Sequence, residues 1–352
     1  MRHRNIVFCV RRNYLDEPGG DTDQMFTWCE VLRKLDNRVT ILSGGISEED
    51  IRDADAVFVW HLERPHESYQ PWLTAKKLRK AIFFVPTCWH PAGERSGLRP
   101  LLEQLAQWFR GIVRFRDRAS RLMLRHSWKR ARAEMLRKSS MHIVNSLSEK
   151  EFLVAEGAPP ERIVCVPNVI RRAEIAAAER RPWEERRGIV CVGHFCPRKN
   201  QLALIRALAK TDVEVTFAGR ARPMHHLYYL FCRWRGGGKH RFLGSIPHDR
   251  VLELLGRSRL CISISRSETP GISNLEAGAL GCALLLPKLA PVEEYFGGHA
   301  VYFDPAKFDP AQLVRAASAE PSPAVREMIM EKYTESVVER FFDRLQLPEE
   351  DV

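Results

Sequence analysis

Long hydrophobic runs are absent from the sequence. The longest uncharged, mostly apolar stretch, Ala277–Pro287, falls well short of the roughly 18 residues that a membrane-spanning helix requires. The apolar run Ile6–Val10 is flanked by arginines and is too short for the hydrophobic part of a secretory signal. The sequence therefore argues against an integral membrane protein and against a secreted one, and we expect a cytoplasmic location.

Paired cysteines are absent as well. Nine cysteines are scattered over 352 residues, and none forms a Cys-x-x-Cys pair. An odd, scattered set predicts neither a disulfide framework nor a zinc site. Most of these cysteines lie in apolar runs, where a thiol packs as a small hydrophobic side chain.

Positive charge is abundant and unevenly distributed. The formal net charge is +11, and residues 91–140 hold 13 Lys and Arg against 4 Asp and Glu, which places +9 in this one segment. The hydrophobic share of 45% indicates a folded protein. A chain of this length typically forms two domains, each large enough for its own core.

Short apolar runs alternate with helical patterns along most of the chain. Six β-rich runs lie between Asn5 and Val166, and six more lie between Ile189 and Phe303. This alternation predicts α/β domains with parallel sheets covered on both faces by helices. The expected organisation is a first domain over 1–172, a linker over 173–187, a second domain over 188–324 and a helical tail over 325–352.

One segment, Ser265–Gly281, concentrates residues suited to ligand binding. It follows a predicted strand, turns through Pro270-Gly271, and opens a helix at Ser273 whose first N–H groups can meet an anion. Glu268 and Glu276 bracket the turn, so both carboxylates can face one crevice. Carboxylates accept hydrogen bonds from sugar or ribose diols, and N–H groups suit phosphate. The combination fits a nucleotide sugar.

A structural interpretation of Glu276 is equally open. The spacing Ser273-x-x-Glu276 is also that of a capping box, in which the glutamate binds the Ser273 backbone. Capping leaves Glu268 unexplained, and capping and ligand binding are not exclusive.

The same segment resembles the Glu-x7-Glu region of the retaining glycosyltransferases of family four. The run Val192–Gln201 resembles that family's phosphate loop, and further landmarks extend the resemblance over roughly Ile189–Asp304. The resemblance implies a GT-B fold, in which two Rossmann-like doubly wound domains face each other across a cleft and the tail helix returns to the first domain. The family pattern Glu-x-x-Gly-x-x-x-x-Glu-Ala-x-Ala-x-Gly is met here by Glu268, Gly271, Glu276, Ala277, Ala279 and Gly281.

The resemblance implies a role for each matched residue. Lys199 would stabilise the leaving diphosphate, Glu268 would bind sugar hydroxyls, and Glu276 would bind the nucleotide ribose. The implied donor-binding set is Gly19, Gly20, Gly193, His194, Arg198, Lys199, Glu268, Gly271, Ile272, Ser273, Asn274, Leu275 and Glu276.

His194 is a departure from the family pattern. It stands where the family usually has arginine, and a neutral imidazole offers one donor and no charge in place of a permanent bidentate cation. Arg198, Arg220 or Arg266 could compensate. Without compensation, donor binding would be weaker or would depend on protonation of His194.

The first half of the chain resembles the family more loosely. Gly19-Gly20 lies in the loop after the first strand, as in the family's acceptor-side glycine loop, before a helix capped by Asp21 or Thr22. The run Val85–His90 ends the fourth strand, where the family places a histidine beside the reacting centre. Taken alone, such a histidine is more often a packed or capping residue. With the resemblance, the catalytic candidates are His90, Glu268 and Lys199.

A metal site is not expected. Asp21-Thr-Asp23 has the spacing of a chelating pair, but it opens a helix, where acids cap the backbone and offset the dipole. The family holds the donor diphosphate without a metal, so cations and helix N-termini must meet its charge. We therefore expect no cofactor, and the nucleotide sugar is a substrate.

The resemblance implies transfer of a sugar with retention of anomeric configuration. A same-face route is implied, in which the departing phosphate oxygen helps deprotonate the acceptor hydroxyl; the sequence does not distinguish it from double displacement. Short motifs at 19–24 and 62–69 look like a subgroup associated with bacterial surface-polysaccharide assembly. The expected acceptor is a glycan or a lipid-linked carrier.

The basic segment contains an amphipathic pattern. Apolar residues recur at helical spacing beside arginines, which suits docking on an anionic membrane, as a peripheral protein at its inner face, or contact with the acceptor. An ordinary helix that packs its apolar stripe on the sheet is equally open. The candidate contact residues are Trp108, Phe109, Arg110, Arg114, Arg118 and Arg121.

Two other classes of function remain in view. A GT-B nucleotide-sugar epimerase or a binding-only relative would share the architecture, although the Glu-x7-Glu and Lys-Asn-Gln set argues against the epimerase. A nucleic-acid-binding protein would explain the basic charge, but no zinc finger, helix-turn-helix spacing or RNP-like motif accompanies it. We expect no nucleic-acid partner.

Overall fold

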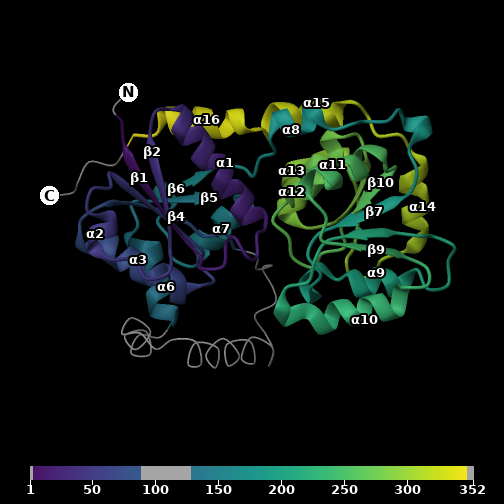
Figure 1. Ribbon diagram of the computed structural model, residues 1–352, viewed down its shortest axis with the longest axis horizontal. Helices are drawn as coiled ribbons and strands as arrows, with labels where there is room; N and C mark the ends of the chain where they lie inside the picture. The colour runs from purple at the N-terminus through teal and green to yellow at the C-terminus, as the bar shows by residue number, and fades with distance from the viewer. Residues whose placement is uncertain (1–2, 89–127, 347–352) are drawn as a thin grey trace. The chain divides into compact units, whose positions relative to one another are not determined.

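The computed structural model describes residues 3–88 and 128–346, and these form two compact units (Figure 1). Unit 1 runs to Pro167 and also includes the chain from Val338 onward, whereas unit 2 runs from Asn168 to Val337. Residues 173–187, the expected linker, thus belong to unit 2. No helix within the described ranges is long and apolar enough to cross a bilayer.

The sheet of unit 1 has six parallel strands in the order β2-β1-β3-β4-β5-β6. Its central strands are almost wholly buried, as expected for runs of β-branched and aromatic residues covered on both faces. Phe8, Phe58 and Phe83 are neighbours across three strands, with ring centroids 5.0 and 4.7 Å apart. The strands are β1 (Asn5–Val10), β2 (Arg38–Ser43), β3 (Ala56–Trp60), β4 (Ala81–Val85), β5 (Met141–Val144) and β6 (Ile163–Cys165).

Helices cover both faces of this sheet. Trp72 and Met135 pack in the core of one face, and on the other Trp28 and Phe342 lie against the Phe58 ring. The helices are α1 (Gly20–Lys34), α2 (Glu48–Ile51), α3 (Pro65–Lys77), α6 (Trp128–Lys138), α7 (Leu147–Ala155) and, from Val338 onward, α16 (Glu335–Arg344).

The sheet of unit 2 also has six parallel strands, in the order β12-β11-β10-β7-β8-β9. Because β10, β7 and β8 are adjacent, the loops at their carboxyl ends meet at one edge, which is where ligands bind in open α/β sheets. The strands are β7 (Ile189–Val192), β8 (Thr216–Ala218), β9 (Arg241–Gly244), β10 (Leu260–Ile262), β11 (Ala283–Pro287) and β12 (Val301–Phe303).

Two hydrophobic cores lie on the two faces of this sheet. In Figure 1, α9 and α10 lie on one side of the strands, and α11, α12 and α13 lie on the other. The helices are α8 (Arg172–Ala177), α9 (Gln201–Ala207), α10 (His226–Gly236), α11 (His248–Arg257), α12 (Ile272–Ala279), α13 (Ala290–Phe296), α14 (Pro310–Ser318) and α15 (Ala324–Lys332). The α/β architecture predicted from the sequence is confirmed.

The helical tail is divided in two. Helix α15 ends at Lys332 and α16 begins at Glu335, because Tyr333 leaves helical geometry and its carbonyl accepts from the Ile170 N–H at 2.8 Å. The prediction of buried cysteines is confirmed for most of the set, namely Cys9, Cys29, Cys88, Cys191, Cys232, Cys261 and Cys282; Cys165 is exposed.

Candidate active site

The loop after β7 brings a glycine and a lysine together. Gly193 leaves the strand with φ of +146°, and its N–H donates to the Ala218 oxygen at 2.9 Å. Gly219, after β8, approaches so closely that a Cβ there would lie 2.0 Å from the Gly193 oxygen, so only glycine fits. The 3₁₀ turn Pro197–Lys199 then leads into α9, and the Lys199 side chain folds back beside Gly193.

Lys199 forms an ion pair with the buried carboxylate of Glu268. The Ser265 hydroxyl donates to the same carboxylate at 2.8 Å, and Arg198 Nη1 lies 3.7 Å from its other oxygen. Burial opposes ionisation of Glu268, but the charges of Lys199 and Arg198 outweigh it and hold the pKa of Glu268 below its usual value. Glu268 is therefore a buried, ionised acceptor.

Helix α12 begins beside this pair. Gly271 precedes Ile272 with φ of +77°, a conformation that favours glycine, and the Asn274 side chain donates to the Pro270 oxygen at 2.9 Å. The first N–H groups of a helix lack intrahelical acceptors, so this turn presents donors next to Glu268. The helix starts one residue earlier than the sequence predicted, at Ile272.

The capping-box interpretation of Glu276 is wrong. Gly271, not Ser273, is the N-cap, and the Glu276 carboxylate lies 2.7 Å from His248 Nε2. The other ring nitrogen of His248 lies 3.3 Å from a carboxylate oxygen of Glu174 on α8. The imidazole can donate to both carboxylates only when it is protonated.

The remaining predicted donor residues of unit 2 have different surroundings. Leu275 is fully buried in the core, so only its backbone is available to a ligand. The His194 carbonyl accepts from Gln201 Nε2 at 2.9 Å, which fixes the loop before Arg198 and Lys199. Ser273 and Ile272 are partly exposed at the start of α12.

In unit 1, Gly19 and Gly20 begin α1 beside a buried ion pair. Gly19 is the N-cap, and its N–H donates to the Thr22 hydroxyl at 3.4 Å, so neither Asp21 nor Thr22 is itself the cap. Arg11 Nε donates to Asp21 at 2.7 Å, and His61 Nε2 lies 3.3 Å from Asp21. The Asp21 carboxylate is thus occupied by contacts with Arg11 and His61.

A second buried carboxylate holds the end of β4. Glu149 accepts hydrogen bonds from the Cys88 N–H at 2.6 Å and from the Asn145 N–H at 2.8 Å. Burial raises the pKa of Glu149 to about 7, although these two hydrogen bonds oppose the shift. The sequence did not single out Glu149, because an acid in a helix start is ordinarily a solvent-exposed residue.

Several predicted residues lie outside the described residues. His90 and the candidate contact residues Trp108, Phe109, Arg110, Arg114, Arg118 and Arg121 fall within 89–127. Within residues 3–88 and 128–346, no group of three or more His, Cys, Asp or Glu side chains is arranged to hold a metal ion.

Comparison with known proteins identifies a matching family for part of the chain. Residues 174–318 match the family model described as Glycosyl transferases group 1. A phosphatidylinositol N-acetylglucosaminyltransferase component from Arabidopsis thaliana is 23% identical over 178 residues, which cover 49% of this chain and 39% of the relative. The chain thus matches well under half of that relative's length.

Solved structures with similar folds align over nearly the whole chain. Sucrose-phosphate synthase from Thermosynechococcus elongatus has a TM-score of 0.73 at 12% identity, covering 97% of this chain and 98% of its own. A glycosyltransferase from Rickettsia africae has a TM-score of 0.71 at 14% identity, covering 97% of each chain. Anabaena HepE in complex with UDP-glucose has a TM-score of 0.70 at 14% identity, covering 97% of this chain and 98% of its own. The chain therefore has the GT-B fold, and its residues 174–318 match the group 1 glycosyl transferases.

Proposed function

We propose that the chain is a glycosyltransferase that moves a sugar from a nucleotide-sugar donor to a glycan or lipid-linked acceptor, with retention and without a metal ion. The observation that carries this proposal is the Lys199–Glu268 pair beside the start of α12. A cation, an ionised carboxylate and helix N–H groups at one sheet edge suit a diphosphate and the hydroxyls of a sugar.

Lys199 is the proposed cation for the donor diphosphate. With no donor bound it neutralises Glu268, and with a donor it lies between the carboxylate and the phosphates. There it stabilises the negative charge that develops on the leaving group. Glu268, kept ionised by its cationic neighbours, accepts hydrogen bonds from the sugar hydroxyls.

Glu276 is the proposed ribose ligand, and His248 positions it. The 2.7 Å contact with His248 Nε2 occupies one carboxylate oxygen and leaves the other for a diol. When protonated, His248 would offset part of the negative charge of Glu276 and Glu174. These contacts are consistent with the UDP-glucose named in the Anabaena HepE structure.

Two arginines, Arg198 and Arg220, are proposed to supply the positive charge that an arginine at position 194 would have provided. Arg198 already lies 3.7 Å from Glu268. The Phe195 N–H donates to the Arg220 carbonyl at 2.9 Å, which places Arg220 beside the His194 loop. Arg220 Nη2 is buried and has no hydrogen-bond partner among the described residues, so its N–H groups can donate to an anionic group.

The proposed chemistry is transfer on one face of the sugar. The bond between the anomeric carbon and the phosphate oxygen breaks, the acceptor oxygen bonds to the same face, and the acceptor proton moves to the departing phosphate. Lys199 and Arg198 balance the charge on that phosphate, and His90 is proposed to lie near the anomeric carbon. NMR of the isolated product tests this: an inverted anomeric configuration would refute the route.

The proposed acceptor belongs to bacterial cell-surface polysaccharide synthesis at the inner face of the membrane. The charge of +9 over residues 91–140 suits an anionic carrier. The Arabidopsis relative is named for a phosphatidylinositol substrate, which is a lipid.

Calorimetry with UDP tests donor binding. Lys199→Ala and Glu276→Ala should each weaken binding by about 10- to 100-fold, because each removes a charge-assisted contact. Lys210→Ala is the matched control, since Lys210 is exposed in the turn after α9. Unchanged UDP affinity in both site variants would refute the proposed donor site.

A binding-only relative is the second candidate, favoured by His194 in place of arginine. It predicts that UDP binds but that no sugar is transferred or interconverted. A thermal-shift screen of nucleotide sugars, followed by product analysis with and without added glycan acceptors, separates it from the transferase and from an epimerase. An epimerase would convert the donor without an acceptor.

A further inference from the structure

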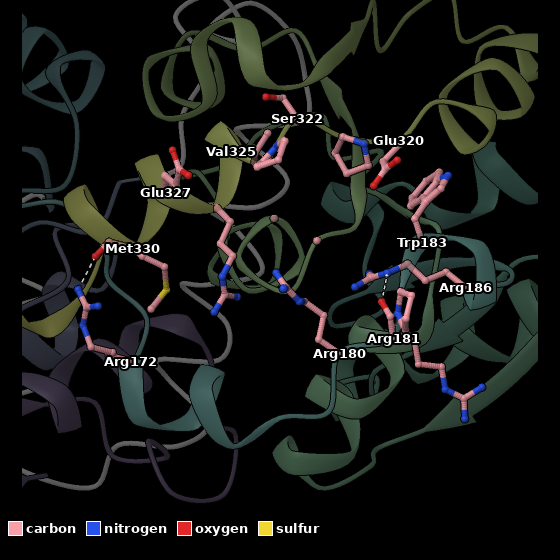
Figure 2. Close-up of a pocket in the computed structure, with 16 residues that line it drawn as sticks. Arg172, Arg180, Arg181, Trp183, Arg186, Glu320, Ser322, Val325, Glu327 and Met330 are labelled. Carbon is pink, nitrogen blue, oxygen red and sulfur yellow. Dashed lines mark hydrogen bonds between the residues drawn. The ribbon is translucent and has the colours of Figure 1, made fainter.

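Unit 2 contains a cavity of about 720 Å³ that is separate from the Lys199–Glu268 pair (Figure 2). Its walls are the segment Arg180–Arg186, helix α15 and the end of α12 at Gly278 and Gly281. Helix α12 is eight residues long, so about 12 Å of helix separates this end from Gly271.

Positive charge dominates the cavity. Five arginines line it, Arg172, Arg180, Arg181, Arg186 and Arg326, against two glutamates, Glu320 and Glu327. In the described part of the chain, no salt bridge joins either glutamate to any of these arginines. Arg181 pairs with Glu179 at 3.4 Å, but the other four arginines still outnumber the two glutamates, so the cavity carries a net positive charge.

Capping of α12 explains two of the arginines. Arg186 Nη2 donates to the Leu280 oxygen at 2.7 Å, and Arg326 Nη1 donates to the Ala279 oxygen. Cations at a helix C-terminus satisfy its last carbonyls and offset its dipole. These two residues therefore have a structural role whether or not a ligand binds.

Capping does not explain Arg180. Within the described ranges its side chain has no hydrogen-bond or ion-pair partner, and Figure 2 shows the guanidinium groups of Arg180 and Arg186 both pointing toward the middle of the cavity. Burial lowers the pKa of Arg326, and the charge of Arg180 lowers it further. The charge of Arg180 thus acts on both capping arginines, since burial lowers the pKa of Arg186 and the charge of Arg180 lowers it further.

We propose that this cavity binds a small molecule that carries two or more phosphate groups. Several phosphate oxygens would neutralise the facing guanidinium groups and accept their N–H donors, which arginine presents in a planar fork. Arg172, on the opposite wall, donates to the Met330 oxygen at 2.7 Å and has further N–H groups for a second phosphate. Trp183 adds an aromatic ring to the lining.

The test uses inorganic tripolyphosphate as the probe, measured by calorimetry. A diphosphate site at Lys199 would also bind this probe, so all proteins carry Lys199→Met/Glu268→Gln, which removes the cation without leaving an unpaired buried charge. Arg180→Gln should weaken binding by about 10- to 100-fold, the loss expected for one charge-assisted contact. It should not lower the melting temperature, because Arg180 makes no internal hydrogen bond with its side chain and its charge repels Arg186 and Arg326.

Arg52→Gln is the matched control, because Arg52 is exposed in unit 1 and the charge change is the same. Equal affinity of the Arg180 and Arg52 variants, or loss of binding in the Lys199→Met/Glu268→Gln background alone, would overturn the proposal. Failure of UDP to bind at Lys199 would leave this result intact, so the two proposals fail separately.

Helix α10 carries an independent feature, an exposed apolar stripe. Leu227 is 81% exposed and Trp234 is 72% exposed, and with Leu230 and Phe231 they share one face of the helix. The opposite face, with Cys232, packs into the core. Large apolar side chains gathered in this way on a solvent-exposed surface indicate an interaction site.

The charge around α10 indicates its partner. Residues 221–241 contain five Arg and Lys and no Asp or Glu. The Arg235 guanidinium lies 5.5 Å from the Trp234 ring centroid, so charge and apolar surface are interleaved. We infer that α10 docks on an anionic membrane surface, where the stripe enters the headgroup boundary and the arginines meet lipid phosphates.

Vesicle flotation tests this inference. The protein should float with vesicles of phosphatidylcholine mixed with phosphatidylglycerol, and far less with phosphatidylcholine alone. The double variant Leu227→Ser/Trp234→Ser should remain unbound, whereas Leu15→Ser, which removes a 64% exposed leucine from unit 1, should bind as the native chain does. Equal binding to both vesicles, or undiminished binding of the double variant, would refute docking through α10.

Discussion

The ion pair of Lys199 and Glu268 is shielded from solvent, since the two side chains are 16% and 4% exposed. Each charge therefore relies on the other in place of water. Replacing Lys199 with methionine leaves a buried carboxylate with a weaker cationic partner. We expect a loss of about 2–4 kcal/mol in the unfolding free energy of unit 2 at neutral pH. Urea unfolding measures it.

The pH dependence of this effect has a defined sign. The lowered pKa of Glu268 means that the pair stabilises unit 2 above the ordinary carboxyl pKa of about 4.3, and that this contribution is lost as the pH falls. The double variant Lys199→Met/Glu268→Gln should recover most of the loss, because it removes the buried charge. A double variant no more stable than the single one would contradict the argument.

Glu149 has the opposite pH dependence. Because its pKa is raised to about 7, the folded state holds the proton more tightly than the unfolded state between about 4.3 and 7. Its contribution therefore falls as the pH rises through that window, by an amount on the order of 3 kcal/mol. Glu149→Gln should remove this slope from the stability of unit 1.

Urea unfolding of the native protein and of Glu149→Gln, at a series of pH values between about 5 and 8, checks the Glu149 prediction. Glu151→Gln is the control, since Glu151 is exposed on the same helix. If the Glu149 and Glu151 variants keep the native slope, the carboxyl titrates as an ordinary surface group. The prediction would then be wrong.

At the scale of elements, the contact between the β7 and β8 loops depends on glycine. Gly219→Ala would place a Cβ 2.0 Å from the Gly193 oxygen, a backbone atom that cannot rotate away. Gly188→Ala is the control, because Gly188 also has positive φ but nothing lies within 4 Å of its Cβ position. The control should cost about 1–2 kcal/mol, and Gly219→Ala clearly more.

Gly219→Ala should also weaken UDP binding, because it displaces the loop that ends at Lys199. Calorimetry and urea unfolding on the two variants separate these effects. Equal losses for Gly188 and Gly219 would mean that only backbone φ, and not the loop contact, determines the cost.

The sequence predicted strand bounds best for strands that are buried on both faces of the sheet. The runs Asn5–Val10, Ala56–Trp60, Ala81–Val85 and Ile189–Val192 have the bounds of β1, β3, β4 and β7, because central parallel strands are continuous apolar segments. Helix α10 was not predicted, since its exposed apolar face removes the amphipathic signal that marks a surface helix.

Contacts between elements were less predictable than the residues themselves. The turn pattern and the family resemblance named Lys199, Glu268 and Glu276 from the sequence. The contact of Glu276 with His248 depends on how α11 packs against α12, and no local spacing encodes that geometry. Arg11 and His61 escaped notice for the same reason, because they meet Asp21 only after the strands of unit 1 pair.

At the scale of the whole molecule, the stability of unit 1 depends on helix α16, which lies more than 300 residues after β1 in the sequence. Phe342 is 5% exposed, and its ring centroid lies 5.5 Å from Trp28 and 6.0 Å from Phe58. Arg4 Nη1 also donates to the Leu345 oxygen at 2.9 Å. Helix α16 is therefore part of the hydrophobic core on the Trp28 face of the unit 1 sheet.

Phe342→Ala should accordingly destabilise unit 1 by about 3–5 kcal/mol, the usual cost of removing a buried aromatic ring, and leave unit 2 unchanged. Because the proposed UDP contacts Lys199 and Glu276 both lie in unit 2, adding UDP should raise the transition of unit 2, and Phe342→Ala should lower that of unit 1. Phe341→Ala is the control, since its ring is only partly buried. A variant that lowers the UDP-sensitive transition instead would show that the last helix stabilises unit 2, against the packing on Trp28 and Phe58.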